Sequence, residues 1–332
     1  MKRVRTMHDS RMIRALTGLL AGALTLCAGA AAQAQQVTLR GVNAFQEGTA
    51  FAKPFEDFIE KVNVDGKGVI QIQYIGGPKA MPPFEVGNAV KSGVVDIANA
   101  TGAFYLNVLP EADALKLSTN TIQEQRANGG WALVNRLHNE KMNTWYLART
   151  GDGIPFHLYT NKLIDKADLK GMTIRVTPIY RAFFAALGAN TVQTPPGEVY
   201  TALERGVVDG YGWPIQGIFD LGWHERTKYR VDPGFYQVDV NILVNLDRWK
   251  KLTDAQRKVL SDAAQWVEAR NALNVDISAA ERKRQADAGI QTIELTGAER
   301  DQWNRTAQDA GWAEIKKNAP QYADELRRLL AP

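Results

Sequence analysis

The 332-residue sequence contains a single cysteine, Cys27, which falls within the first 34 residues. From residue 35 onward there is no thiol, which excludes disulfides, thiolate-bound metals and a cysteine nucleophile. Histidine is almost as scarce, because only His138, His157 and His224 occur after residue 34. A chain of about 300 residues can bury enough apolar surface to be stable without disulfides.

An excess of charge of one sign is also lacking. The formal net charge is +4, but residues 1–34 carry five basic side chains and one acidic one, so residues 35–332 are neutral overall. A neutral chain has no basic patch for nucleic acid or an anionic membrane surface, so we expect no nucleic-acid partner. No apolar run after residue 34 approaches the roughly 18 residues that a membrane-spanning helix needs.

Motifs for catalysis and cofactor binding are missing too. The sequence has no GxxxxGK followed by Ser or Thr, no GxGxxG after a predicted strand, no HExxH and no GxSxG. No cluster of His, Asp and Glu has the spacing of metal ligands, so the sequence predicts neither a cofactor nor a metal site. An enzyme is therefore the weaker class, and we expect a protein that is not an enzyme.

The N-terminus has the three parts of a secretory signal peptide. Met1–Arg14 is basic, Ala15–Leu26 is an apolar stretch too short to span a bilayer, and Ala32–Ala34 supplies small residues for cleavage. We expect cleavage after Ala34. A membrane anchor is one alternative, and a lipoprotein attached through Cys27 is another, although the bulky Leu26 precedes that cysteine.

Hydrophobic periodicity predicts strands that alternate with helices, an order typical of an α/β protein with largely parallel sheets and helices on their faces. The predicted elements are strands over 37–42, 69–74, 94–98, 172–176 and 207–211 and helices over 51–62, 82–92, 180–187 and 198–205.

Two features indicate two lobes. Asn88–Asp96 resembles Thr201–Asp209, since each reads as a helix end, a glycine, a short strand and an acid. The match is either a coincidence in a common turn or the mark of two similar lobes, and the length of the chain favours two α/β lobes. The stretch from Thr253 to Gly289 predicts a helix of roughly 50 Å, long enough to cross both.

Binding sites in two-lobed α/β proteins lie between the lobes, near the carboxyl ends of strands. A buried strand is normally apolar and does not need a charged residue such as Arg175. This arginine therefore forms either a surface ion pair or a bidentate clamp on a carboxylate. Trp213 either packs in the core or faces the ligand. The other candidates that follow predicted strands are Phe45, Gln46, Glu47, Thr101, Tyr105 and Tyr211.

Two segments resemble motifs of the solute-binding proteins of tripartite ATP-independent periplasmic (TRAP) transporters, of the dicarboxylate-binding-protein type. Ala167–Val176 is similar to the family segment D-L-x-G-x-x-I-R-V, whose arginine binds the substrate carboxylate and corresponds to Arg175. Pro196–Gly210 is similar to the family run P-x-E-x-Y-x-A-L-x-x-G-x-x-D-G. The resemblance covers nearly all of residues 37–332.

The resemblance implies two α/β lobes joined by hinge strands, with the long helix spanning both. Lobe one would comprise residues 37–154 and 239–278, and lobe two residues 155–238 and 279–332. The cleft would close on a small carboxylate ligand, and the closed protein would deliver it to the membrane subunits of the transporter. The resemblance also implies a location in the periplasm, and we expect a monomer.

Two departures from the family pattern bear on the ligand. Trp213 follows Asp209-Gly210 where the family often has a polar Asn, and His157 aligns with a second basic contact that is often an Arg. These changes predict a small monocarboxylate with an apolar or aromatic body, such as a 2-hydroxy or 2-keto acid. The alternatives are a sugar acid, an amino acid or a C4-dicarboxylate as ligand, or a ligand-sensing subunit of a membrane receptor.

Overall fold

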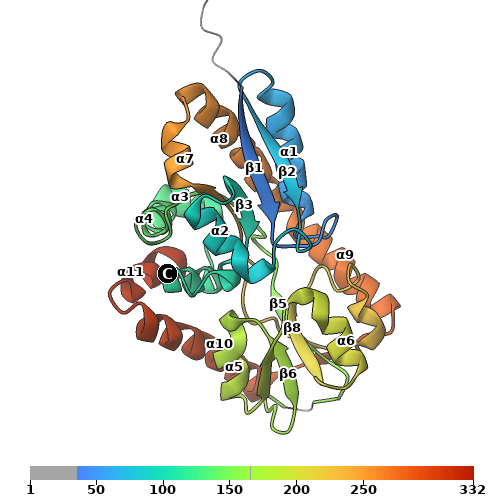
Figure 1. Ribbon diagram of the computed structural model, residues 1–332. Helices are drawn as coiled ribbons and strands as arrows, with labels where there is room; N and C mark the ends of the chain where they lie inside the picture. Colours follow the sequence, from blue (N-terminus) through green and yellow to red (C-terminus); the bar gives the residue numbers. More distant parts are fainter. Residues whose placement is uncertain (1–35, 165) are drawn as a thin grey trace, which may run out of the picture. The chain divides into compact units, whose positions relative to one another are not determined.

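Two mixed β-sheets organise the chain from Val37 to Pro332 (Figure 1). The computed structural model describes residues 36–164 and 166–332, so the predicted signal peptide, with Cys27, lies outside the described residues. In the described part of the chain, no helix is both long and apolar enough to cross a membrane. The α/β fold with two sheets confirms the predicted fold class.

The first sheet has the strand order β2-β1-β3-β10-β4. Strand β1 is parallel to β2 and β3, as the alternation of strands and helices predicts, and β10 is antiparallel to β3 and β4. The strands are β1 (Val37–Asn43), β2 (Ile70–Gly76), β3 (Ile97–Ala100), β4 (Thr144–Thr150) and β10 (Val240–Asn245).

The second sheet has the order β11-β9-β5-β8-β6-β7, with β6 parallel to β7 and β8, and β5 antiparallel to β8 and β9. The chain passes from one sheet to the other through residues 151–155 and back through residues 233–239. The strands are β5 (Phe156–Thr160), β6 (Thr173–Val176), β7 (Asn190–Gln193), β8 (Gly210–Pro214), β9 (Tyr229–Asp232) and β11 (Gln291–Glu294).

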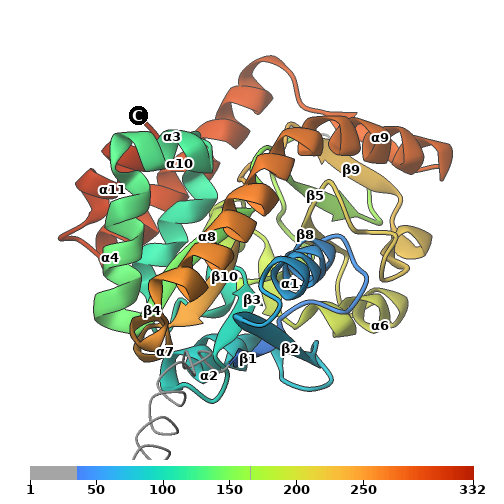
Figure 2. The same cartoon turned by 90° about the horizontal axis from the view of Figure 1, so that it is seen from above.

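Helices cover the faces of the first sheet. Helix α1 (Lys53–Asp65) lies beside α8 (Asp254–Ala269), and both bury apolar side chains against the strands (Figure 2). Phe55, Phe58 and Val62 of α1 are fully buried, as their helical spacing predicts. The other helices connected to this sheet are α2 (Val86–Ser92), α3 (Ile122–Asn128), α4 (Gly130–Met142) and α7 (Leu246–Lys251).

The remaining helices are adjacent in sequence to the strands of the second sheet, and the last two, α10 (Gly297–Asn318) and α11 (Ala323–Leu330), pack on segments connected to the first sheet. Helix α10 packs on α5 and on the 3₁₀-helix Pro110–Leu117, and Leu330 of α11 accepts backbone hydrogen bonds from Thr119 and Asn120. The C-terminal helix therefore packs on segments that the sequence assigns to lobe one, and the lobe boundaries stay a prediction. The helices are α5 (Pro178–Ala186), α6 (Val199–Glu204), α9 (Asn274–Asp287), α10 (Gly297–Asn318) and α11 (Ala323–Leu330).

The long helical segment begins at the predicted capping box of Thr253 and Gln256 and runs along both sheets, but it is not one continuous α-helix. A 3₁₀ turn, Arg270–Leu273, joins α8 to α9. At this turn, the side chain of Asn271 accepts a hydrogen bond from Gly151 N (2.9 Å) and donates one to Arg149 O (3.1 Å). The change of helical pitch thus coincides with a hydrogen-bonded contact to the segment that crosses between the sheets.

The internal repeat is real and longer than the sequence comparison indicated. Nine of fifteen residues are identical between Pro82–Asp96 and Pro195–Asp209. In both copies a 3₁₀ turn that begins at the second proline leads into a helix, and a glycine of positive φ follows it. The strands start three residues later than predicted, at Ile97 and Gly210.

The acidic residues at the end of the two copies explain why both strands begin later than predicted. Asp96 N donates to Arg40 O (2.9 Å), and the Asp96 carboxylate accepts from Arg40 N (2.8 Å). Asp209 N donates to Thr173 O (2.7 Å), and its carboxylate accepts from Thr173 N (2.9 Å). Because each acid pairs with one residue of the neighbouring parallel strand through both its backbone and its side chain, it fixes where the next strand begins.

We expect Asp96→Ala and Asp209→Ala each to lower the free energy of unfolding by about 1–3 kcal/mol, because a strand N–H loses a charged acceptor. The exposed Asp301 on α10 is the control, and Asp301→Ala is expected to change the stability by less than about 0.5 kcal/mol. Urea unfolding of the ligand-free protein measures all three. Equal stability of the three variants would contradict this role of the repeat.

Candidate functional site

The carboxyl ends of β1, β3, β6 and β8 meet around an inner cavity between the two sheets. Its empty space, including the part open to solvent, measures about 350 Å³. The wall is mostly aromatic and aliphatic. The lining residues are Phe45, Phe51, Thr101, Ala103, Phe104, Phe156, Thr177, Ile179, Tyr180, Trp213, Pro214, Val238, Asp239 and Val240.

An outer cavity adjoins the inner one and shares Phe45, Phe51 and Trp213 with it. Its empty space measures about 850 Å³, open part included. The first residues of both repeat copies, Pro82–Pro83 and Pro195–Glu198, lie on its wall. The two copies therefore face the same opening from the two sheets.

Two contacts join the sheets beside this opening. Asp220, which follows β8, accepts a hydrogen bond from Ala50 N (2.7 Å), which follows β1. The ring of Phe51 meets the ring of Trp213 edge-on, with centroids 5.9 Å apart. Both contacts connect a residue of the first sheet's segment with one of the second, so the walls of the cleft touch at its mouth.

Arg175 lies in β6 and is fully buried. Its Nη1 donates to Tyr180 Oη (3.0 Å), while Nη2 (2.6 Å) and Nε (3.1 Å) donate to Thr194 O. Burial lowers the pKa of this guanidinium from its ordinary value. Among residues 36–164 and 166–332, no carboxylate pairs with it, so a buried cation is held by neutral acceptors alone.

Arg175 is not itself on the wall of the inner cavity, but its neighbours Tyr180, Trp213 and Thr177 are. Its Cζ lies 5.8 Å from the centroid of the Trp213 ring. Three buried polar atoms near it, Trp213 Nε1, Thr177 Oγ1 and Thr194 Oγ1, have no hydrogen-bond partner in the described chain. Since buried polar groups are nearly always hydrogen-bonded, these three atoms are candidates for contact with a polar group of a ligand.

Trp213 packs in the core and also lines a cavity wall, and its contact with a ligand stays a prediction. Its ring packs edge-on against Trp223, with centroids 4.7 Å apart, and it also lines both cavities. Only 6% of the residue is exposed. It is therefore part of the core of the second sheet and part of the cavity wall at the same time.

The structure brings five of the nine predicted site residues to the cavities or to their wall. Phe45, Thr101 and Trp213 line the inner cavity, Gln46 lines the outer one, and Arg175 lies directly behind the wall. Glu47 is exposed and is not among the lining residues.

Tyr105 and Tyr211 are buried away from both cavities. The hydroxyl of Tyr105 accepts from Asn241 Nδ2 (2.9 Å), and the hydroxyl of Tyr211 is hydrogen-bonded to Thr227 Oγ1 (2.7 Å). Burial raises the pKa of both phenols well above their ordinary value. Both side chains therefore act in the core in this structure.

His157 lies within the second sheet rather than on either cavity wall. Its Nδ1 is 2.9 Å from Val231 O and 2.9 Å from Asp232 Oδ1, and its Nε2 is 3.2 Å from Arg282 Nη2. Burial lowers the pKa of His157. With both ring nitrogens occupied, it resembles a structural histidine more than the second basic ligand contact that the family alignment predicted.

Several wall residues were not predicted from the sequence. Phe51 and Tyr180 are aromatic residues whose helical or turn positions gave no sign that they reach the cleft. Asp239 also lines the inner cavity, and burial raises its pKa to about 6. The one available sign was an acid between two valines at the start of an apolar strand.

The sequence matches the model of the family described as bacterial extracellular solute-binding protein, family 7, over residues 42–318. The chain belongs to this family, which contains the solute-binding proteins of TRAP transporters. The predicted resemblance is thereby confirmed.

Two curated relatives cover most of the chain. A monocarboxylate 2-oxoacid-binding periplasmic protein of Nostoc sp. (strain PCC 7120) is 23% identical over 278 residues, which is 79% of this chain and 75% of the relative. A solute-binding protein of Roseobacter denitrificans is 25% identical over 326 residues, or 95% of this chain and 99% of the relative.

Solved structures of TRAP solute-binding proteins share the fold. One from Desulfovibrio salexigens, with bound orotic acid, has a TM-score of 0.79 at 21% identity and covers 88% of this chain and 97% of its own. One from a marine metagenome, specific for aromatic acids and bound to 3-hydroxybenzoate, has a TM-score of 0.77 at 22% identity and covers 90% and 99%. The two-lobed fold that the sequence predicted is thus confirmed.

Proposed function

We propose that this protein binds a small monocarboxylate with an apolar or aromatic body in the inner cavity and delivers it to TRAP membrane subunits. It would do so as a monomer that catalyses no reaction, after export to the periplasm and removal of residues 1–34. The single observation that carries this proposal is the buried Arg175, which has neutral acceptors but no counter-ion in the described chain.

The cost of burying an unpaired charge supports a carboxylate as the ligand. An isolated ionised group in an apolar interior is unfavourable unless it is paired and hydrogen-bonded. Three of the five N–H groups of Arg175 have acceptors, so two can still donate to the planar fork of a carboxylate. We propose that the ligand carboxylate reaches these donors beside Trp213 and Thr177.

The aromatic wall supports a compact, apolar body. Phe45, Phe104, Phe156 and Trp213 offer flat apolar surface around the cavity. The Nostoc relative is named for monocarboxylate 2-oxoacids, and two of the solved neighbours hold a pyrimidine acid and an aromatic acid. These ligands share one carboxylate and a small body, which is the chemistry we propose here.

Arg175→Ala is expected to cost about 2–5 kcal/mol of binding free energy, because the ligand carboxylate would stay buried without its partner. Arg175→Lys is expected to weaken binding as well, since an ammonium group cannot reproduce the two parallel donors. Calorimetry with the acid that gives the largest thermal shift in an organic-acid panel measures both.

The exposed Arg181 on α5 provides the matched control, and Arg181→Ala should bind as the wild type does. Melting of each ligand-free variant checks that it is folded. Unchanged affinity in folded Arg175→Ala would reject the clamp.

Trp213→Asn restores the residue type that is common in the family, and we expect it to weaken binding of apolar and aromatic acids by about 1–3 kcal/mol. Small polar acids should lose less. Because Trp213 also packs on Trp223, the melting temperature of the ligand-free variant should fall too. The ranking of acids across the panel is therefore the decisive measurement, and an unchanged ranking would assign Trp213 to packing alone.

Cleavage after Ala34 predicts a mature chain of 298 residues that begins at Gln35. The intact mass of protein recovered from the periplasm measures this directly. A mass that retains residues 15–26, or that includes a lipid on Cys27, would contradict the proposed processing.

A further inference from the structure

Asp239 lines the inner cavity, yet neither the apolar wall nor the proposed carboxylate clamp at Arg175 gives this acid a role. It lies in the segment that returns from the second sheet to the first, directly before β10, and only 2% of it is exposed. It is the one charged side chain among the described residues that line this cavity. Arg175 approaches from the second sheet, so the acid and the base belong to different walls.

The two oxygens of Asp239 have different surroundings. Oδ2 accepts from Gly102 N (2.7 Å) and from Asn241 Nδ2 (2.9 Å). Oδ1 has one contact in the described chain, from Thr101 Oγ1 at 3.4 Å, which is long for a hydrogen bond with a hydroxyl donor. Because each carboxylate oxygen can accept two hydrogen bonds, Oδ1 keeps free capacity.

Oδ2 of Asp239 has a structural role that is separate from the role of Oδ1. A Cβ atom at residue 102 would lie 2.9 Å from Oδ2, so a glycine is needed for the backbone N–H to come this close. This bond holds the 3₁₀ turn Gly102–Phe104, whose last residue lines the cavity. Any test of Oδ1 must therefore leave Oδ2 in place.

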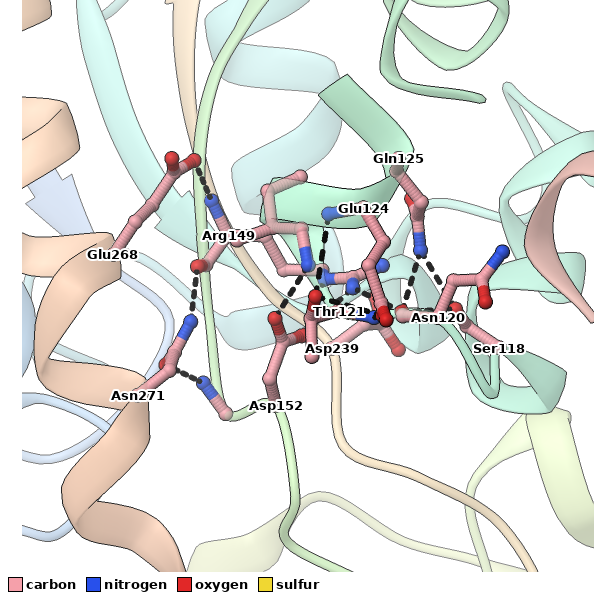
Figure 3. Close-up of polar contacts among 12 residues, drawn as sticks. Ser118, Asn120, Thr121, Glu124, Gln125, Arg149, Asp152, Asp239, Glu268 and Asn271 are labelled. Carbon is pink, nitrogen blue, oxygen red and sulfur yellow. Dashed lines mark hydrogen bonds and ion pairs between the residues drawn. The ribbon is translucent and has the colours of Figure 1, made fainter. Parts of the chain in front are cut away.

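No basic side chain of residues 36–164 or 166–332 bonds to Asp239. Arg149 on β4 acts on it only through space, because its Nε and Nη2 bond to Asp152 and Nη2 also bonds to Asn120 O (Figure 3). Burial has the larger effect on Asp239 and raises its pKa to about 6. Oδ1 is thus a buried acceptor with unfilled capacity and no basic partner in the described chain.

We propose that Asp239 selects the ligand by accepting, at Oδ1, a hydrogen bond from an O–H or N–H group that the acid carries away from its carboxylate. This inference rests on the proposed function, since Arg175 must hold the other end of the ligand. The substrate class narrows to compact hydroxy acids and N–H acids with an apolar ring or chain between the two groups.

The same oxygen also rejects two classes of acid. An acid with only C–H groups at this position would leave a buried acceptor unfilled, and a site with such a group discriminates strongly against the analogue that lacks the donor. A dicarboxylate would bring its second negative charge against Asp239, and like charges that are buried together repel.

The test compares acids of equal shape that differ in one donor. Pyrrole-3-carboxylate carries a ring N–H that can only donate, and furan-3-carboxylate has a weak acceptor at the same place. 3-Hydroxybenzoate and benzoate form a larger pair. By calorimetry, we expect the wild type to bind the donor acid of a pair about 10- to 100-fold more tightly than its partner.

Asp239→Asn is the informative variant because it replaces only the free acceptor. The Asn Oδ1 can take the place of Asp239 Oδ2 and accept from Gly102 N and Asn241, while its NH₂ group turns toward Thr101 Oγ1. The preference for pyrrole-3-carboxylate should then vanish or reverse in favour of furan-3-carboxylate. Asp209→Asn, which changes a carboxylate away from both cavities, should keep the wild-type preference.

The outcomes separate this inference from the proposed function. If the wild type and Asp239→Asn bind both acids of a pair with the same ratio, the site binds carboxylates but Asp239 does not select them. If a chelator abolishes binding to the wild type, Asp239 acts through a metal ion, which also overturns the inference. If none of the four acids binds the wild type, the proposed function fails and the inference fails with it.

Discussion

A buried guanidinium that pairs with no carboxylate of the described residues is the constraint around which this molecule is arranged. Arg175 is fully buried, and its bonds go to the hydroxyl of Tyr180 and the carbonyl of Thr194. These neutral acceptors orient the fork but leave its charge uncompensated, which is tolerated in a protein interior only where a partner can arrive. In the function proposed above, the two sheets, the short strand β6 and the aromatic wall keep this charge away from water and within reach of a ligand carboxylate.

The internal repeat connects this chemistry to the fold. In each copy an acidic residue pairs with the neighbouring strand, and a pair of prolines lies at the mouth of the cleft. The same local arrangement therefore occurs once in each sheet. Closure of two lobes on a ligand is a common conformational device, and the contact of Asp220 with Ala50 joins the two walls at that mouth. A ligand bound between the sheets would therefore be covered from both sides by equivalent segments.

Local patterns in the sequence predicted the fold class and five of the eleven strands of the described chain, β1, β2, β3, β6 and β8. The apolar stripe of α1, the capping box of α8 and the βαβαβ order need only residues that are close in the chain. Arg175, Phe45 and Thr101 could be located because strand ends mark the binding edge of such sheets. The sequence did not show which partner each side chain contacts. His157 was a candidate through the family resemblance, yet α9, more than a hundred residues later, supplies Arg282 beside its ring. The turn Gly102–Phe104 likewise sends Tyr105 into the core, and the return of the chain before β10 brings Asp239 to the cavity.

The measurement that tests the central claim most directly is a crystal structure of the protein with its tightest-binding monocarboxylate. The account predicts both carboxylate oxygens of the ligand within hydrogen-bonding distance of the Arg175 guanidinium, with the body of the ligand against Trp213. A carboxylate bound elsewhere in the cleft, with the guanidinium still bonded only to Tyr180 and Thr194, would contradict it.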